Sequence, residues 1–227
     1  MIKAVIFDLD NTLLDFVKMK RFAIRAAMSA MVEAGLEIDE QNAYDEIFKM
    51  YEKSGWENQT IFNDYLHQQF GHVNNKYLAA GIVAYRRARE ATLQVYPNVN
   101  KTLFELLKIG IKLAVVSDAP SREAWMRIYY LNLHHIFDHV ITFDDSKAHK
   151  PSPKPFQMAM AALDVRTDEV LMIGDWPDRD VVGAKQLGIR TLFARYGDKF
   201  DVKESGADWD IDDIYEIVGI IQELNSA

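Results

Sequence analysis

The sequence contains no cysteine, and this absence excludes several kinds of chemistry. Disulfide bonds, thiolate nucleophiles and cysteine-ligated zinc all require thiols. Long apolar runs are missing as well. The first run, Ala4 to Phe7, ends at Asp8 and is too short for the core of a signal peptide, and no stretch reaches the roughly 20 apolar residues of a membrane span. We therefore expect a cytoplasmic protein with no membrane partner.

An excess of positive charge is also lacking. The 34 acidic and 26 basic residues give a formal net charge of -8 at pH 7. A chain of this charge is repelled by polyanions, so we expect no nucleic-acid partner. The 227 residues are 49% hydrophobic, which is enough for one domain with a sizeable insertion or for two small domains. The sequence leaves the oligomeric state open.

The second half of the chain alternates between apolar strand patterns and amphipathic helix patterns. The expected strands are 111–117, 139–142, 169–175, 190–194 and 209–211, and the expected helices are 98–109, 121–130, 154–163, 179–187 and 213–224. Continuous apolar strands joined by helical crossovers predict a parallel sheet that is covered on both faces. The fold class is therefore α/β, with a Rossmann-like parallel sheet flanked by helices.

The first half of the chain shows a different pattern of expected secondary structure. Residues 2–7 form a short apolar strand pattern, and helical patterns follow at 16–34, 39–53, 59–70 and 75–91. The economical interpretation is an all-helical insertion after the first strand. We expect residues 1–15 and 96–227 to form the α/β core domain and residues 16–95 to form a helical domain.

Polar side chains gather where the expected strands end. They are Asp8, Asp10 and Thr12 after the first strand, Ser117 and Asp118 after the second, Lys150 in the loop after the third, and Asp175, Asp178 and Asp180 after the fourth. A single Asp in such a place is usually a turn or cap residue, and Ser117 could merely cap a helix. Parallel sheets, however, bind ligands at the carboxyl ends of their strands, so these residues are expected to meet.

Carboxylates crowded together at one edge repel each other and require a cation. Oxygen ligands without His or Cys favour Mg²⁺, which commonly shares its coordination shell with water and substrate phosphate. The pattern therefore predicts a magnesium site that handles a phosphorylated ligand.

These motifs resemble those of the haloacid dehalogenase superfamily, in its phosphatase branch. "DLDNT" at 8–12 is similar to the first family motif, Ser117 to the second, Lys150 to the third and "GDWPDRD" at 174–180 to the fourth. They occur in the family's order. The helical block at 16–95 is similar to the mobile cap domain that this family inserts after its first strand.

The resemblance implies a role for each catalytic residue. Asp8 would be the nucleophile that forms an aspartyl-phosphate, and Asp10 would protonate the leaving alcohol and then activate water. Ser117 and Lys150 would hold the phosphoryl oxygens, in a substrate site that also includes Thr12 and Asp118.

The resemblance also implies a metal site. Mg²⁺ would be bound by the Asp8 carboxylate, the Asp10 backbone carbonyl and Asp175. Asp180 would orient Lys150 and metal-bound water. Asp178 is the weaker candidate for that task, and an N-cap role suits it better if a helix begins near it.

The implied function is that of a Mg²⁺-dependent phosphatase acting on a small soluble phosphate monoester. A 2-haloacid dehalogenase is an alternative within the superfamily, although expulsion of halide needs neither Asp10 nor the metal. A phosphomutase is nearer, and Thr12 favours a phosphatase because the mutases often have Val there. A phospho-accepting signalling module is the alternative of a different class, but it would have no clear use for a cap. The sequence does not name the substrate.

Two further groups of residues have less specific interpretations. Lys18, Arg21 and Arg25 form a basic stripe that is either a solvated face or a reader of the far end of the substrate. His134 and His135 show no metal-ligand spacing, and we expect them to pack at the surface or core edge.

Overall fold

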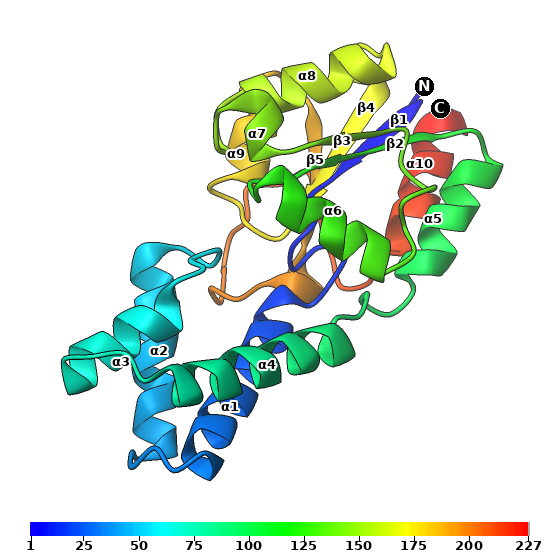
Figure 1. Cartoon of the computed structure of the whole chain (residues 1–227). Helices are drawn as coiled ribbons and strands as arrows, with labels where there is room; N and C mark the ends of the chain where they lie inside the picture. The colour runs from blue at the N-terminus through cyan, green and yellow to red at the C-terminus, as the bar shows by residue number, and fades with distance from the viewer. Residues whose placement is uncertain (227) are drawn as a thin grey trace. The chain divides into compact units, whose positions relative to one another are not determined.

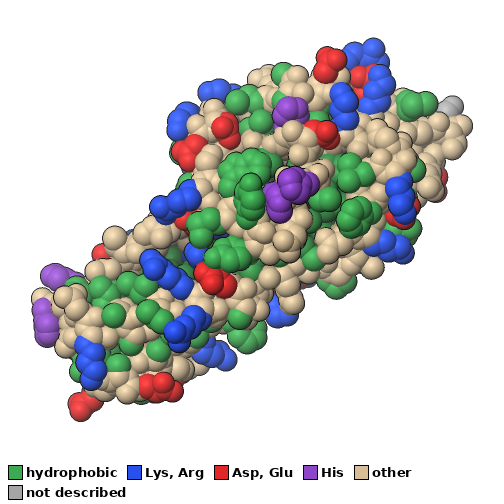
Figure 2. Space-filling view, turned by 45° about the vertical axis from the view of Figure 1, so that its right-hand side comes forward, with side chains coloured by type: hydrophobic (Ala, Val, Ile, Leu, Met, Phe, Trp, Pro, Cys, Tyr) green, Lys and Arg blue, Asp and Glu red, His purple; other side chains and the backbone are tan. Residues whose placement is uncertain are grey.

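The chain folds into two compact units in a computed structural model that describes residues 1–226. The first, which we call the α/β unit, consists of residues 1–15 and the chain from Gln94 onward. The second, the helical unit, is Phe16–Leu93. Within the described residues, no helix is both long enough and apolar enough to cross a membrane. On the face seen in Figure 2, acidic and basic side chains are interspersed rather than separated by sign.

The α/β unit is built on a six-stranded parallel sheet (Figure 1). Its strands are β1 (Ala4–Phe7), β2 (Lys112–Val116), β3 (His139–Ile141), β4 (Val170–Gly174), β5 (Arg190–Ala194) and β6 (Trp209–Ile211). Their order is β3-β2-β1-β4-β5-β6, which is the doubly wound Rossmann order. This arrangement confirms the predicted α/β fold class.

Helices cover both faces of this sheet (Figure 1). They are α5 (Val99–Lys108), α6 (Ser121–Tyr130), α7 (Phe143–Ser146), α8 (Lys154–Leu163), α9 (Asp180–Lys185) and α10 (Glu216–Ser226), with single 3₁₀ turns η1 (Thr167–Glu169) and η2 (Arg195–Gly197). Helices α8 and α9 pack on one face, where Phe156 and Ala184 meet alternate strand residues such as Ile6 and Met172. Since the strands are apolar on both faces, they were recognisable from sequence as buried.

The helical unit contains α1 (Phe16–Glu33), α2 (Glu40–Ser54), α3 (Ile61–Phe70) and α4 (Asn75–Thr92). Helices α1 and α4 approach closely at Gly81, where an added Cβ would lie 2.1 Å from Met31 Cε. Local capping residues determine where helix α2 begins and where helix α3 ends. Asp39 caps α2 by accepting a hydrogen bond from Asn42 N at 2.7 Å, and Gly71 ends α3 in the left-handed conformation.

Most predicted elements lie within two residues of the observed ones, and the later start of α10 has a physical cause. Helix α10 begins at Glu216 rather than at 213, because the Glu216 side chain accepts hydrogen bonds from Asp212 N and Asp213 N and holds the preceding residues in a turn. The short helix α7 and the turns η1 and η2 were not predicted.

Candidate active site

The register of the sheet aligns the carboxyl ends of its central strands. Phe7 of β1 lies opposite Val115 of β2 and Ile173 of β4, so the residues that follow these strands emerge side by side. Asp8 N donates to Ile173 O at 2.9 Å, which extends the β1 ladder by one residue. Asp8, Ser117 and Asp175 therefore begin from neighbouring and rigid backbone positions.

Lys150 is the cation of this site. Its side chain is buried and comes from the loop after α7. The ammonium group donates to Asp8 Oδ1, to Asp180 Oδ1 at 2.7 Å and to the carbonyl of Val116 at 3.2 Å. Burial lowers the pKa of Lys150, but attraction to Asp180, Asp8 and Asp118 outweighs burial and raises the pKa above its ordinary value. Lys150 therefore carries its charge at neutral pH.

Three buried carboxylates surround this lysine. Oxygens of Asp8, Asp175 and Asp180 lie within 4.8 Å of one another. Burial, with repulsion from Asp8 and Asp180, raises the pKa of Asp175 well above its ordinary value, although Lys150 opposes that rise. Burial likewise raises the pKa of Asp180 to about 6, against the opposing effect of Lys150. One lysine leaves this cluster with excess negative charge, so its all-oxygen donor set fits a hard divalent cation.

Gly174 allows Asp180 to reach this cluster. A Cβ at position 174 would lie 2.3 Å from Asp180 Cγ, so a side chain there would displace the carboxylate. Asp180 is 1% exposed, and its second oxygen accepts a hydrogen bond from Trp176 N at 3.0 Å. The Gly-Asp pair at 174–175 thus contributes to the cluster in two ways. Asp175 supplies one carboxylate, and Gly174 leaves space for the carboxylate of Asp180.

The loop after β1 is held from two sides. Within the loop, Thr12 Oγ1 donates to Asp8 Oδ2 at 3.1 Å and lies 3.4 Å from Asp175 Oδ1. From outside, Tyr196 Oη of η2 donates to the carbonyl of Thr12 at 2.9 Å. Gly197 packs so tightly against Asn11 that an added Cβ would lie 1.8 Å from Asn11 O. The turn η2 therefore fixes the backbone that carries both aspartates.

Asp10 lies in the same loop but has a different partner. Its Oδ2 accepts a hydrogen bond from Arg127 Nη1 of α6 at 2.6 Å. Arg127 is 6% exposed, whereas the Asp10 side chain is 24% exposed. Among the described residues, the carboxylate cluster that could hold a metal consists of Asp8, Asp175 and Asp180, so the Asp10 carboxylate is not part of it. The sequence interpretation overlooked Arg127, because an arginine on an amphipathic helix has no local signal of burial.

Ser117 and Asp118 lie at the end of β2, where we expected them. Ser117 is buried and its hydroxyl accepts a hydrogen bond from Ala119 N at 3.1 Å. It does not cap α6, whose N-cap residue is Pro120. Asp118 holds the next loop, because its two oxygens accept from Lys150 N at 2.9 Å and from Arg179 Nη1 at 3.0 Å.

Asp178, His134 and His135 lie outside the cluster of Asp8, Asp175 and Asp180. Asp178 is exposed in the turn before α9, whose N-cap is Arg179, so the suggested N-cap role for Asp178 is wrong. The chain turns once more before the helix starts, which gives Asp180 the buried position. His134 stacks on Tyr129, with ring centroids 4.4 Å apart, and packs at a tilt against His135, with centroids 4.1 Å apart, as expected for packing residues.

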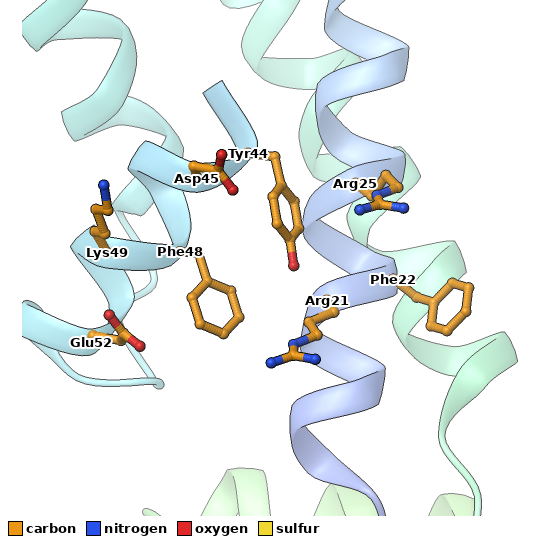
Figure 3. A pocket seen from close by; sticks show the side chains of 8 residues that line it. All are labelled: Arg21, Phe22, Arg25, Tyr44, Asp45, Phe48, Lys49 and Glu52. Carbon is orange, nitrogen blue, oxygen red and sulfur yellow. The ribbon is translucent and has the colours of Figure 1, made fainter. Parts of the chain in front are cut away.

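The helical unit carries a separate groove of about 700 Å³ between α1 and α2 (Figure 3). Arg21 and Arg25 line it from successive turns of α1. Their guanidinium groups lie over the rings of Phe48 and Tyr44, at 5.6 Å and 5.1 Å from the ring centroids. Asp45, Lys49 and Glu52 complete the α2 side. Two members of the predicted basic stripe therefore lie over aromatic rings and remain exposed.

Comparison with known proteins places this geometry in a family. The family model described as haloacid dehalogenase-like hydrolase matches residues 2–188. A glyceraldehyde 3-phosphate phosphatase of Methanocaldococcus jannaschii is 33% identical over 227 residues, covering 99% of each chain. A second protein of that name, from Pyrococcus abyssi, is 34% identical over 87% of this chain and 83% of its own.

A solved structure agrees with these matches. The crystal structure of a HAD phosphatase from Thermococcus onnurineus superposes with a TM-score of 0.70 at 28% identity, covering 97% of this chain and 98% of that one. The family match spans β1, β2 and β4, and hence every residue of the carboxylate cluster and Lys150. The chain therefore belongs to the haloacid dehalogenase-like hydrolase family.

Proposed function

We propose that this protein is a Mg²⁺-dependent phosphatase that hydrolyses a small phosphate monoester through an aspartyl-phosphate. The observation that carries the proposal is the buried cluster of Asp8, Asp175 and Asp180 around Lys150 at the carboxyl ends of β1 and β4. A fixed cation beside a carboxylate nucleophile suits attack on a phosphoryl group, whose negative charge must be offset in the transition state.

In the first step, a carboxylate oxygen of Asp8 forms a bond to phosphorus while the bond from phosphorus to the ester oxygen breaks. The departing alkoxide takes a proton from Asp10, which acts as a general acid. Lys150 already contacts Asp8, so its ammonium group is suited to neutralise a phosphoryl oxygen next to the attacking carboxylate. Ser117, which lies on the neighbouring strand end, would donate its hydroxyl hydrogen to another phosphoryl oxygen.

In the second step, water attacks the phosphorus of the aspartyl-phosphate. Asp10, now a carboxylate, takes a proton from that water, and the bond from phosphorus to Asp8 breaks. Inorganic phosphate leaves and Asp8 is regenerated. Asp10 thus serves as acid and then as base, which requires a carboxylate separate from the nucleophile and from the metal ligands.

The metal would be held by Asp8, Asp175 and the backbone carbonyl of Asp10. Bound there, Mg²⁺ would supply positive charge that offsets both the carboxylate cluster and the incoming phosphate. The raised pKa of Asp175 supports this assignment, because it reflects burial and carboxylate repulsion that a cation would relieve. Asp180 would hold Lys150 in place, as its contact with the ammonium group suggests.

Glyceraldehyde 3-phosphate is the substrate that we propose to test first. The relatives of that name from Methanocaldococcus jannaschii and Pyrococcus abyssi are 33% and 34% identical to this chain and cover most of it. We further propose that the helical unit acts as the cap that selects the substrate. In this family, closure of a cap over the bound substrate would exclude water from the site and confer specificity.

The test is release of inorganic phosphate from glyceraldehyde 3-phosphate and a panel of about a hundred phosphometabolites, ranked by kcat/KM because specificity is expressed in that ratio. Activity should require Mg²⁺, disappear with EDTA and return when Mg²⁺ is added in excess. Full turnover in metal-free buffer would refute the metal assignment. A preference for a substrate other than glyceraldehyde 3-phosphate would refute the substrate but not the reaction.

A further inference from the structure

The buried arginine of α6 has no assigned role in the reaction described above. Arg127 is 6% exposed, and its guanidinium group lies 2.6 Å from the carboxylate of Asp10, which is 117 residues earlier in the chain. Charged side chains are rarely buried unless they are paired, because desolvation of the charge is costly. A buried arginine that reaches a loop next to the nucleophile therefore calls for a functional explanation.

The packing of α6 determines where this guanidinium points. Ala124, Arg127 and Ile128 are all buried and lie on one stripe of the helix, at spacings of three and four residues. Arg127 is thus directed inward by the same face that anchors α6 to the α/β unit. Arg122 on the same helix contrasts with it, since its side chain is 73% exposed and pairs with the adjacent Glu123 at 3.0 Å.

Two aspartates of one loop consequently have two different cations. Asp8 contacts Lys150, while Asp10 contacts Arg127. Lys150 and Thr12 hold Asp8 inside the buried cluster, and Arg127 holds the Asp10 carboxylate apart from it. This separation matters because a nucleophile and an acid–base group must approach the same phosphorus from different directions.

We propose that Arg127 is a positioning residue for Asp10. The ion pair fixes the direction of the Asp10 carboxylate, and through it the path of the proton to the leaving oxygen and from the attacking water. The inference rests on the proposed function, since it assigns Asp10 the acid–base role. Arg127 itself would touch neither substrate nor metal.

A double-mutant cycle on kcat tests this proposal. Arg127→Met keeps the length of the side chain and removes its charge, and Asp10→Asn removes the proton donor. On an alkyl phosphate, Arg127→Met should lower kcat by about 10–10²-fold, a part of the 10²–10⁴-fold that general acid–base catalysis contributes. KM should change by less than about threefold, because the loss falls on the chemical step. Arg127→Lys, which can restore the cation, should recover part of the activity.

The decisive comparison is made in the Asp10→Asn background. If Arg127 acts through Asp10, adding Arg127→Met to Asp10→Asn should cost almost nothing further, because residues of one unit are not additive. On p-nitrophenyl phosphate, whose leaving group needs no proton, Arg127→Met should impair the first step much less than on the alkyl ester. Arg122→Met, on the exposed face of α6, is the matched control and should behave as wild type.

Other results would overturn the inference. If the two losses multiplied, or if Arg127→Met impaired alkyl and aryl esters equally in the first step, Arg127 would be a structural anchor for α6 and not a positioning residue. Thermal unfolding of every variant shows whether the fold is retained, and Arg127→Gln, which also removes the positive charge, replaces Arg127→Met if the latter does not fold. Wild-type protein that hydrolyses no phosphate ester would refute the proposed function together with this inference, whereas an active wild type with additive losses refutes the inference alone.

Discussion

Replacement of Gly197 by alanine tests how closely the loop of the two aspartates depends on η2. The added Cβ would lie 1.8 Å from Asn11 O and 3.1 Å from Asp175 Cβ. Carbon and oxygen atoms that are not bonded stay at least 3.0 Å apart, so the η2 turn and the Asn11 peptide must separate by about 1 Å. The backbone of Gly197 has no left-handed φ, so the cost arises from lack of space and not from backbone conformation.

The expected magnitude follows from this displacement. Insertion of a methyl group into a packed interior typically costs about 1–3 kcal/mol of stability, which corresponds to a Tm lower by roughly 2–12 °C in a protein of this size. Activity should fall further than stability indicates, because a displacement of about 1 Å at a catalytic group can cost about 10²-fold in rate. We therefore expect kcat/KM to fall by about that factor at a temperature where the variant is fully folded.

Gly219→Ala provides the matched control. Gly219 lies in α10, and a Cβ there would meet nothing within 4 Å. Alanine in a helix interior is favoured over glycine by up to about 1 kcal/mol, so this variant should gain stability and keep full activity. The assays are thermal unfolding and phosphate release for both variants. Wild-type kcat/KM in Gly197→Ala would refute the view that η2 positions the catalytic loop.

Three further predictions concern charge. Burial and carboxylate repulsion raise the pKa of Asp180 to about 6 and also raise the pKa of Asp175, so the metal-free cluster stabilises the fold at low pH and loses this stability as pH rises through about 6. Mg²⁺ should therefore raise Tm more at pH 8 than at pH 5. An equal rise in Tm at both pH values would contradict the assignment of this cluster as the metal site. Lys150→Met leaves three buried carboxylates without their cation and should cost about 3–5 kcal/mol in denaturant unfolding as well as abolish turnover, so a loss below about 1 kcal/mol would be inconsistent with the ion pairs described. Arg21→Gln in the helical unit should change the ranking of substrates more than it slows hydrolysis of p-nitrophenyl phosphate, and uniform loss across substrates would indicate a structural role.

Much of the α/β unit was predictable because its strands are short, apolar and separated by helical patterns. The same logic located the candidate site: strands that run parallel must deliver Asp8, Ser117 and Asp175 to one edge, whichever helices connect them. Asp180 was also expected near this edge, because it lies just beyond Asp175 in a stretch that is similar to the fourth family motif. These inferences need only the order of elements and the identity of the residues that follow each strand.

Other features depended on contacts that no local pattern reveals. From the sequence, Arg127 cannot be distinguished from a polar residue on the exposed face of a helix, and its partner Asp10 is 117 residues away. The close approach of Gly197 to Asn11 is likewise a tertiary contact. Helix α7 is a different case, because Thr142 and Asp145 form a capping box, a spacing that could have been recognised in the sequence.

We propose different tasks for the two aspartates of the loop after β1, and a burst experiment with p-nitrophenyl phosphate tests this proposal most directly. Asp8→Asn removes the nucleophile, so it should show no burst and almost no turnover. Asp10→Asn keeps the nucleophile and loses the base of the second step, so it should release one equivalent of nitrophenolate quickly and then turn over slowly as aspartyl-phosphate accumulates. A burst from Asp8→Asn, or steady slow release without a burst from Asp10→Asn, would contradict the account.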